Sequence, residues 1–131
     1  MFRWIAERFK RDSREPIRID AVQADEFGMH SKRSSGEALH LLWRDVVLVR
    51  GYKRDLLTTD SVVIEFELPN AVVIRSWEED PAFREVVAAA ERYLTGFPPY
   101  KVWYAVVVMP PFKTRFHTLW GQPTDEAPAL P

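Results

Sequence analysis

The most constraining feature of this sequence is the strict alternation of residues 61–68, SVVIEFEL. Its even-numbered positions are all large and apolar, whereas two of its odd-numbered positions are glutamates. A period of two residues predicts a β-strand with one buried face. Pro69 and Asn70 predict a tight turn, because proline suits its first corner and asparagine tolerates left-handed dihedral angles. We therefore expect residues 72–77 to be the return strand of an antiparallel hairpin.

Shorter alternating patterns predict more strands on both sides of this hairpin. We expect them near Ile17–Ala21, Phe27–Met29, Leu39–Trp43, Val46–Tyr52 and Phe112–Trp120. The small polar stretch at residues 31–36, SKRSSG, predicts a hairpin loop. Asp45 predicts a bend, and residues 56–60 predict a turn.

The period changes at Asp80-Pro81, and a helix is predicted over residues 81–95. Aspartate is a favoured N-cap, proline suits the first helical position, and Gly96 suits the residue after the last turn. Three carboxylates lie together in WEEDP, residues 77–81. We interpret them as acids stabilised by the helix dipole rather than as catalytic or metal-binding acids. The buried stripe of the helix is expected to be Phe83, Val87, Ala90 and Leu94.

Residues 100–109, YKVWYAVVVM, fit two structures. Their β-branched and aromatic content favours a strand, which is the interpretation that we prefer. The alternative is a short helix that begins after Pro98-Pro99 and turns Val102, Val106 and Met109 inward.

The chain of 131 residues fits one domain with a sizeable core. We predict an α+β domain over residues 16–120, built as an antiparallel, strongly bent sheet or partly open barrel. One main helix at 81–95 would fill its inside. Residues 1–15 are predicted to be an N-terminal amphipathic helix or tail, and residues 121–131 a disordered C-terminal tail.

Composition excludes several functions. A formal net charge of −1 argues against general nucleic-acid binding, which needs many cations on one face. The absence of cysteine excludes disulfides, thiolate nucleophiles and cysteine-type zinc sites. The first residues lack the apolar stretch of a signal peptide, and no apolar run reaches the roughly 20 residues of a membrane span. We expect a cytoplasmic protein, with a peripheral position at the inner membrane as the alternative.

The sequence offers no recognisable catalytic set. Its three histidines, His30, His40 and His117, are far apart and fall on separate predicted strands. None belongs to a nucleophile elbow, and the glycines never show phosphate-binding spacing. A metal site would have to be assembled across strands, so we predict no catalytic residue, no cofactor and no metal.

Two series of motifs point to a family. The first comprises Gly28 in a strand, Trp43-Arg44-Asp45-Val46 at a corner, and the helix from Pro81. The second comprises Thr58-Thr59-Asp60 ahead of a strand, Gly96-Phe97 after the helix, and the aromatic strand Phe116 to Trp120. Over residues 17–120 the chain thus resembles small uncharacterised bacterial proteins with a pleckstrin-homology-like fold. The resemblance implies a fold and a bacterial source, and it implies no reaction. The chain departs from the plain plan by its further structure after the helix.

Basic and aromatic residues supply the candidate contact sites. Two interpretations fit the cluster Tyr52, Lys53 and Arg54. It is the end of a strand that leaves the core, or it is a contact site for a protein partner. The second follows from the enrichment of tyrosine and arginine at binding hot spots. Lys32 and Arg33, in the predicted hairpin loop, are further candidates and could touch an anionic group.

The N-terminus suggests a membrane contact as an alternative. Phe2, Ile5 and Phe9 share one helical face, with Trp4 beside it and five cations around it. We keep Phe2, Trp4, Ile5 and Phe9 as candidate membrane-binding residues.

The resulting prediction is a non-catalytic protein-interaction module, of adaptor or immunity type, whose partner is another protein. A homodimer is an alternative mode of association. The alternative functions are a peripheral module that binds anionic lipid through the N-terminal helix, and a small enzyme or ligand-binding barrel.

Overall fold

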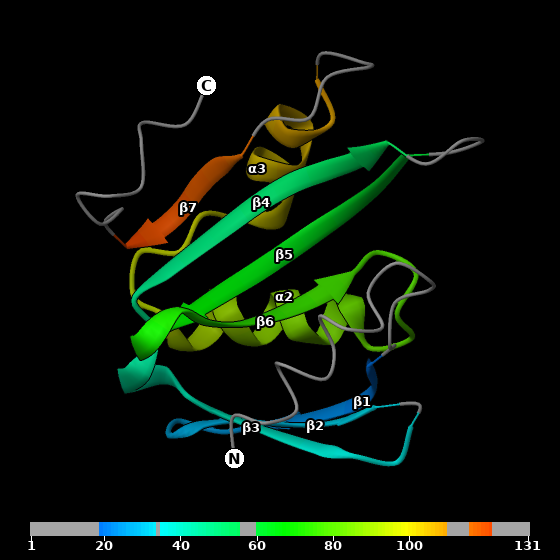
Figure 1. The fold of residues 1–131 in the computed structure, drawn as a ribbon. Helices are drawn as coiled ribbons and strands as arrows, with labels where there is room; N and C mark the ends of the chain where they lie inside the picture. The colour runs from blue at the N-terminus through cyan, green and yellow to red at the C-terminus, as the bar shows by residue number, and fades with distance from the viewer. Residues whose placement is uncertain (1–18, 34, 56–59, 110–115, 122–131) are drawn as a thin grey trace.

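The computed structural model describes residues 19–33, 35–55, 60–109 and 116–121. These residues form two antiparallel sheets and two α-helices (Figure 1). The three-stranded sheet has the order β1 (Ile19–Ala24), β2 (Gly28–Arg33) and β3 (Ala38–Leu42). The four-stranded sheet has the order β6 (Val72–Trp77), β5 (Asp60–Leu68), β4 (Leu48–Asp55) and β7 (His117–Gly121). The helices are α2 (Phe83–Tyr93) and α3 (Tyr100–Val107), with short 3₁₀ turns at Trp43–Asp45 and Pro69–Ala71.

The α+β class and the antiparallel pairing are confirmed, but the strands divide between two sheets instead of forming one bent sheet. The described residues form no closed barrel. The division falls at the 3₁₀ turn after β3, where the Trp43 indole Nε1 donates a hydrogen bond to the Asp25 carbonyl at 2.8 Å. After this turn the chain enters β4, which pairs with β5 and β7 and not with β3.

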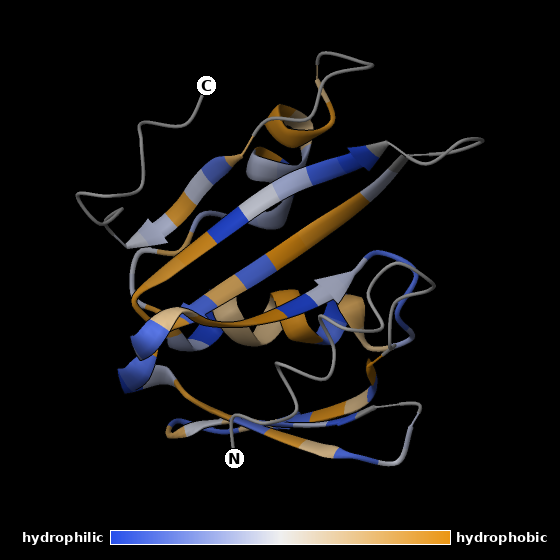
Figure 2. Cartoon of the chain, viewed as in Figure 1, coloured by the Kyte–Doolittle hydropathy of each residue, from blue (hydrophilic) through white to orange (hydrophobic). Residues whose placement is uncertain are grey.

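Helix α2 lies between the two sheets (Figure 1) and buries one face. Apolar residues, orange in Figure 2, recur along α2 and along β4 and β5. A single hydrophobic cluster takes side chains from both sheets and both helices. At the end of α2, Tyr93 stacks on Trp43 with ring centroids 5.8 Å apart. Both sheets and both helices therefore share a main core, and Tyr52, Val63 and Trp77 form a second, smaller cluster.

The start of α2 differs from the prediction. The helix begins at Phe83 rather than Pro81, and no side chain caps it. Asp80 is buried, and its carboxylate accepts hydrogen bonds from Ser76 Oγ at 3.0 Å and from the Trp77 backbone at 2.9 Å. The carboxylate thus closes the turn between β6 and α2. The helix ends at Tyr93, two residues before the predicted Thr95, and Gly96, with a φ of +88°, lies in the turn that follows.

The preferred strand at residues 100–109 is wrong, because these residues form α3. Trp103 and Val107 face the core, whereas Val102 and Val106 are exposed. The helical alternative therefore predicted the helix but assigned the wrong face to the core. The Pro99 carbonyl accepts the first hydrogen bonds of the helix, from the backbones of Val102 at 3.0 Å and Trp103 at 3.2 Å.

Smaller differences concern turns and strand ends. Ser31–Arg33 belong to β2, so the predicted loop at 31–36 is too long. The Pro69-Asn70 turn is confirmed, with a φ of +68° at Asn70. The predicted N-terminal helix or tail, the turn at 56–59 and the tail from residue 122 onward lie outside the described residues.

Candidate functional site

The predicted contact residues Tyr52, Lys53 and Arg54 do not form one exposed cluster. They alternate across β4, and only 3% of Tyr52 and 1% of Lys53 are exposed. Arg54 is exposed, with its guanidinium 5.4 Å from the centre of the Trp77 ring. Tyr52 and Lys53 are therefore parts of the interior and not the solvated end of a strand.

Tyr52 joins a polar network across three neighbouring strands. Its hydroxyl donates to Glu65 Oε1 at 3.0 Å, and Arg75 Nε donates to the same oxygen at 3.0 Å. The Phe116 ring packs on Tyr52 with centroids 4.5 Å apart. Burial, and then the negative charge of Glu65, raise the pKa of Tyr52 above its ordinary value. The phenol therefore stays protonated and acts as a structural donor.

Lys53 lies on the other face of β4 and reaches α3. Its Nζ donates to the Val108 carbonyl at 3.2 Å, at the C-terminal end of the helix. A cation at this end satisfies a free carbonyl and interacts favourably with the helix dipole. Lys53 thus fixes α3 against the four-stranded sheet.

The remaining predicted contact residues lie elsewhere. Lys32 is exposed on β2, in the three-stranded sheet, and Arg33 is the last residue of that strand. Neither is part of the sheet that carries Arg54. The candidate membrane residues Phe2, Trp4, Ile5 and Phe9 lie outside the described residues, so that contact stays a prediction.

The side chains of Glu78 and Glu79 accept hydrogen bonds from other elements of the fold. Glu78 accepts hydrogen bonds from the Val62 backbone at 3.1 Å and from the Tyr104 hydroxyl at 2.8 Å. Glu79 accepts from Ser61 Oγ at 2.6 Å. Burial and the hydrogen bond to Glu78 raise the pKa of Tyr104 to about 12. These carboxylates therefore join β5 to α3 and to the turn before α2.

The structure brings two of the three histidines together. His30 of β2 and His40 of β3 are directly paired, with their Nδ1 atoms 2.6 Å apart, whereas His117 belongs to β7. Within the described segments, no group of three or more histidine, cysteine, aspartate or glutamate side chains is arranged to hold a metal ion.

The three residues that the helical alternative for 100–109 turned inward form an exposed apolar surface instead. Val102, Val106 and Met109 are 58%, 50% and 62% exposed and follow one another at intervals of four and three residues. Val102 and Val106 share one face of α3, and Met109 follows just beyond the C-cap residue Val108. We call these three residues the α3 stripe. The sequence shows these residues as an apolar repeat. Trp103 and Val107 form a second apolar face of the same segment, so the sequence alone does not show which face is buried.

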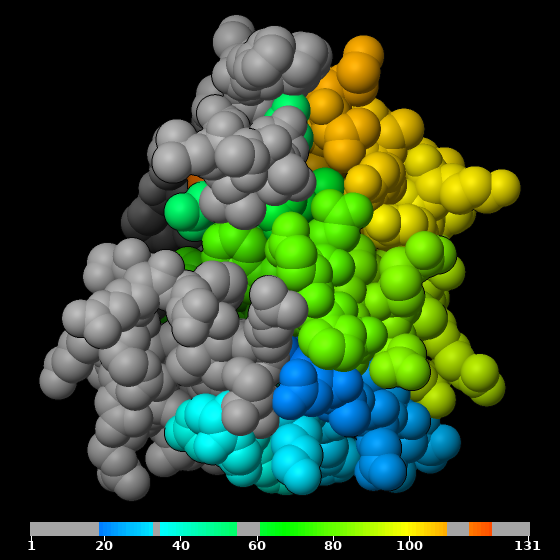
Figure 3. Space-filling view, turned by 90° about the vertical axis from the view of Figure 1, so that its right-hand side faces the viewer, coloured from blue at the N-terminus to red at the C-terminus, as the bar shows by residue number. Residues whose placement is uncertain are grey.

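The α3 stripe lies on a helix that stands open at the surface, coloured yellow to orange in Figure 3. A smaller apolar area lies at the other sheet, where Phe27 and Leu42 line a hollow of about 370 Å³ together with Glu26 and Arg44. The hollow has two charged residues among its four lining residues, whereas the three residues of the stripe are all apolar. The stripe is therefore the stronger candidate for a contact surface.

Comparisons of the chain with protein-family models, with curated proteins and with solved structures found no match. Among the helices that the structure describes, none combines the length and the apolar character required to cross a membrane.

Proposed function

We propose that the protein is a non-catalytic interaction module that docks onto another protein through the α3 stripe. The observation that carries this proposal is the exposure of at least half of each side chain of Val102, Val106 and Met109. Contiguous exposed apolar side chains are a common mark of a protein contact. An adaptor or immunity-type role, in which the module blocks its partner, is the form of this function that we favour.

The helix that carries the stripe is held in place by contacts on its other sides. Trp103 and Val107 are 3% and 2% exposed, and Lys53 binds the carbonyl of Val108 at the end of the helix. Tyr104 donates to Glu78, and the Tyr100 backbone donates to Glu91 at 2.7 Å. A contact surface that is already ordered loses less conformational entropy when it binds.

The size of the stripe favours insertion into a groove of a different protein over a dimer of this chain. An α-helix of eight residues is about 12 Å long. The three side chains of the stripe expose a few hundred Å², whereas a standard interface buries about 800 Å² on each partner. Two stripes packed on each other would thus make too small a contact. A helix laid in an apolar groove buries more surface, because the groove walls also contact its flanks.

Charge gives a further property of the partner. Lys101 is exposed and is the one charged residue of α3, which contains no acid. Opposite charges at the rim of an interface guide association. We therefore propose an apolar groove with acidic groups at its rim.

The pleckstrin-homology-like family and the cytoplasmic location are part of the same proposal. Support for the family comes from the order of antiparallel strands followed by α2, and from the glycine at the start of β2. Helix α3 and strand β7 follow α2 as additions to the plain plan.

Photo-crosslinking in the native host tests the docking surface. A photoreactive amino acid replaces Val106 in one strain, and in the control strain it replaces Ala88, which is exposed on α2. The proposal predicts a discrete crosslinked protein from position 106 and none from position 88. The captured protein, once purified, is expected to bind this chain directly.

Three results would contradict the proposal. One is the absence of any crosslinked protein from position 106. The second is crosslinking of this chain to itself at that position, which would indicate a homodimer. The third is flotation of the purified chain with anionic vesicles that is lost in the Val106→Ser variant, since this result would make the stripe a membrane contact.

A further inference from the structure

We propose that His30 and His40 form a chelating site for a divalent transition-metal cation of the Ni²⁺ or Cu²⁺ type. The site lies on the exposed face of the three-stranded sheet. Helix α3 packs on β4, which belongs to the other sheet. It is independent of the proposed docking function. Imidazole nitrogens are favoured ligands for these metals.

The backbone places the two rings together. His30 and His40 are direct partners in the antiparallel ladder between β2 and β3. Their rings meet edge to face with centroids 4.7 Å apart, and the two Nδ1 atoms are 2.6 Å from each other. At this distance at least one Nδ1 must present a lone pair, because two N–H groups cannot point at each other. The two Nδ1 atoms are therefore close enough to bind one ion, which would lie to the side of the line that joins them.

The separation of the two nitrogens suits one coordination geometry better than another. At a metal–nitrogen distance of about 2.0–2.1 Å, a right angle between two ligands puts their nitrogens about 2.9 Å apart. A tetrahedral angle would put them about 3.3 Å apart. The observed 2.6 Å is closer to the right angle, which is the angle in square-planar and octahedral complexes. Ni²⁺ and Cu²⁺ adopt square-planar or tetragonal geometry, whereas Zn²⁺ in proteins is mostly tetrahedral.

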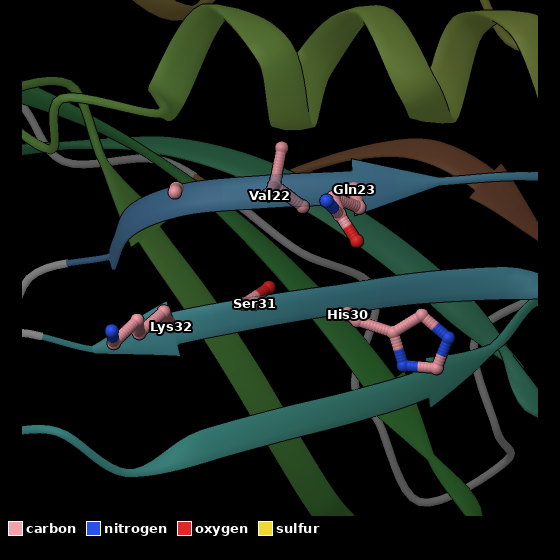
Figure 4. A pocket seen from close by; sticks show the side chains of 6 residues that line it. Val22, Gln23, His30, Ser31 and Lys32 are labelled. Carbon is pink, nitrogen blue, oxygen red and sulfur yellow. The ribbon is translucent and has the colours of Figure 1, made fainter.

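The neighbouring strand places a third polar side chain beside the two histidines. Gln23 of β1 is the direct partner of His30, so Gln23, His30 and His40 form a row across the three strands. Gln23, His30 and Lys32 border a hollow of about 260 Å³ (Figure 4). The Gln23 amide oxygen can complete a site whose other positions hold water. Lys32 is two residues from His30 on the same strand, so its positive charge is expected to weaken metal binding.

Titration calorimetry with NiCl₂ on the untagged chain tests this inference. The expected result is one Ni²⁺ ion for each chain, and MgCl₂ is expected to give no heat, because Mg²⁺ prefers oxygen ligands. The His30→Asn and His40→Asn variants are each expected to bind Ni²⁺ at least tenfold more weakly. His117→Asn is the matched control and is expected to bind like the wild type.

Circular dichroism spectra check the fold of each variant, which we expect to be unchanged because both imidazoles are exposed. A second variant keeps both imidazoles: Lys32→Gln removes the nearby charge and is expected to tighten Ni²⁺ binding a few-fold. The inference is overturned if the wild type binds no Ni²⁺, or if His117→Asn alone abolishes binding. One metal ion for every two chains would also overturn it, because such a ratio indicates a bridge between molecules.

Discussion

Trp103 of α3 packs directly against Gly51 of β4. A Cβ atom built on Gly51 would lie 3.3 Å from Cζ3 of the Trp103 indole, 3.3 Å from Cγ2 of Val107 and 3.1 Å from Cδ1 of Leu119. The missing side chain thus makes the space into which the buried face of α3 fits. Because that face is fixed, Val102 and Val106 must point away from the sheet.

Filling this space should destabilise the fold. We expect Gly51→Val to lower the free energy of unfolding by about 1–3 kcal/mol, because overpacking forces neighbouring side chains from their places. Gly51→Ala is expected to cost less than Gly51→Val. Ala105→Val adds bulk on the exposed side of α3 and should cost below about 1 kcal/mol. Urea denaturation followed by tryptophan fluorescence measures all three, and a Gly51→Val variant as stable as the wild type would show that α3 packs differently.

Gly28 is expected to tolerate no side chain. A Cβ atom there would lie 2.1 Å from the Leu41 carbonyl oxygen, which belongs to the paired strand and cannot move without breaking the ladder. We predict that Gly28→Ala destabilises the protein by about 3 kcal/mol, at the upper end of ordinary single substitutions. The control is Gly36→Ala, which has open space but a φ of +91° and should cost about 1–2 kcal/mol. Equal losses for the two variants, measured by thermal unfolding, would refute the close approach.

The Tyr52 network predicts a loss of stability at alkaline pH. An unfolded tyrosine ionises near pH 10, whereas the pKa of Tyr52 in the folded protein is raised by burial and by Glu65. Above about pH 10 the unfolded state therefore binds fewer protons than the folded state, and stability falls as the pH rises. The stabilisation is fully present below pH 10 and is lost toward the folded-state pKa.

Tyr52→Phe should reduce this slope and lower stability at pH 8 by about 1 kcal/mol, because Glu65 loses one donor. Part of the slope should remain, since Tyr104 also has a raised pKa, of about 12. Urea denaturation at pH 8, 10 and 11 measures both effects. Identical slopes for the wild type and the variant would mean that Tyr52 is not the buried donor described above.

Lys53 is predicted to contribute to stability despite its burial. Lys53→Ala removes the donor to the Val108 carbonyl and leaves a space beside α3, with an expected loss of about 2–3 kcal/mol. Lys101→Ala removes an exposed lysine from the same helix and should change stability by less than about 0.5 kcal/mol. If thermal unfolding ranks the two variants in the opposite order, Lys53 is not the anchor of α3.

The sequence predicts those parts of the fold that a local pattern determines. The strand at 61–68, its turn at Asn70 and the stripe of α2 follow from periodicity and turn chemistry within a few residues. Helix α3 does not, because it is apolar on two sides. Which side is buried depends on Gly51, which lies about fifty positions earlier in the chain.

The candidate sites show the same limit. Lysine is usually exposed, so the burial of Lys53 could not be expected from its type. The pairing of His30 with His40 depends on the register of β2 and β3, and the predicted loop at 31–36 hid that register by including the end of β2. Long-range packing and strand register therefore determine the burial of Lys53 and the pairing of the two histidines, and composition and residue spacing do not predict either.

The affinity between this chain and the protein captured at position 106 tests the central claim most directly. The variant Val102→Ser/Val106→Ser removes two of the three apolar side chains of the α3 stripe and leaves the buried residues Trp103 and Val107 unchanged. Its matched control, Phe27→Ser, removes an exposed aromatic residue from the turn between β1 and β2. If α3 is the docking surface, titration calorimetry will show at least a tenfold loss of affinity for the double variant and none for Phe27→Ser. Wild-type affinity in the double variant, with an unchanged circular dichroism spectrum, would contradict the proposed function.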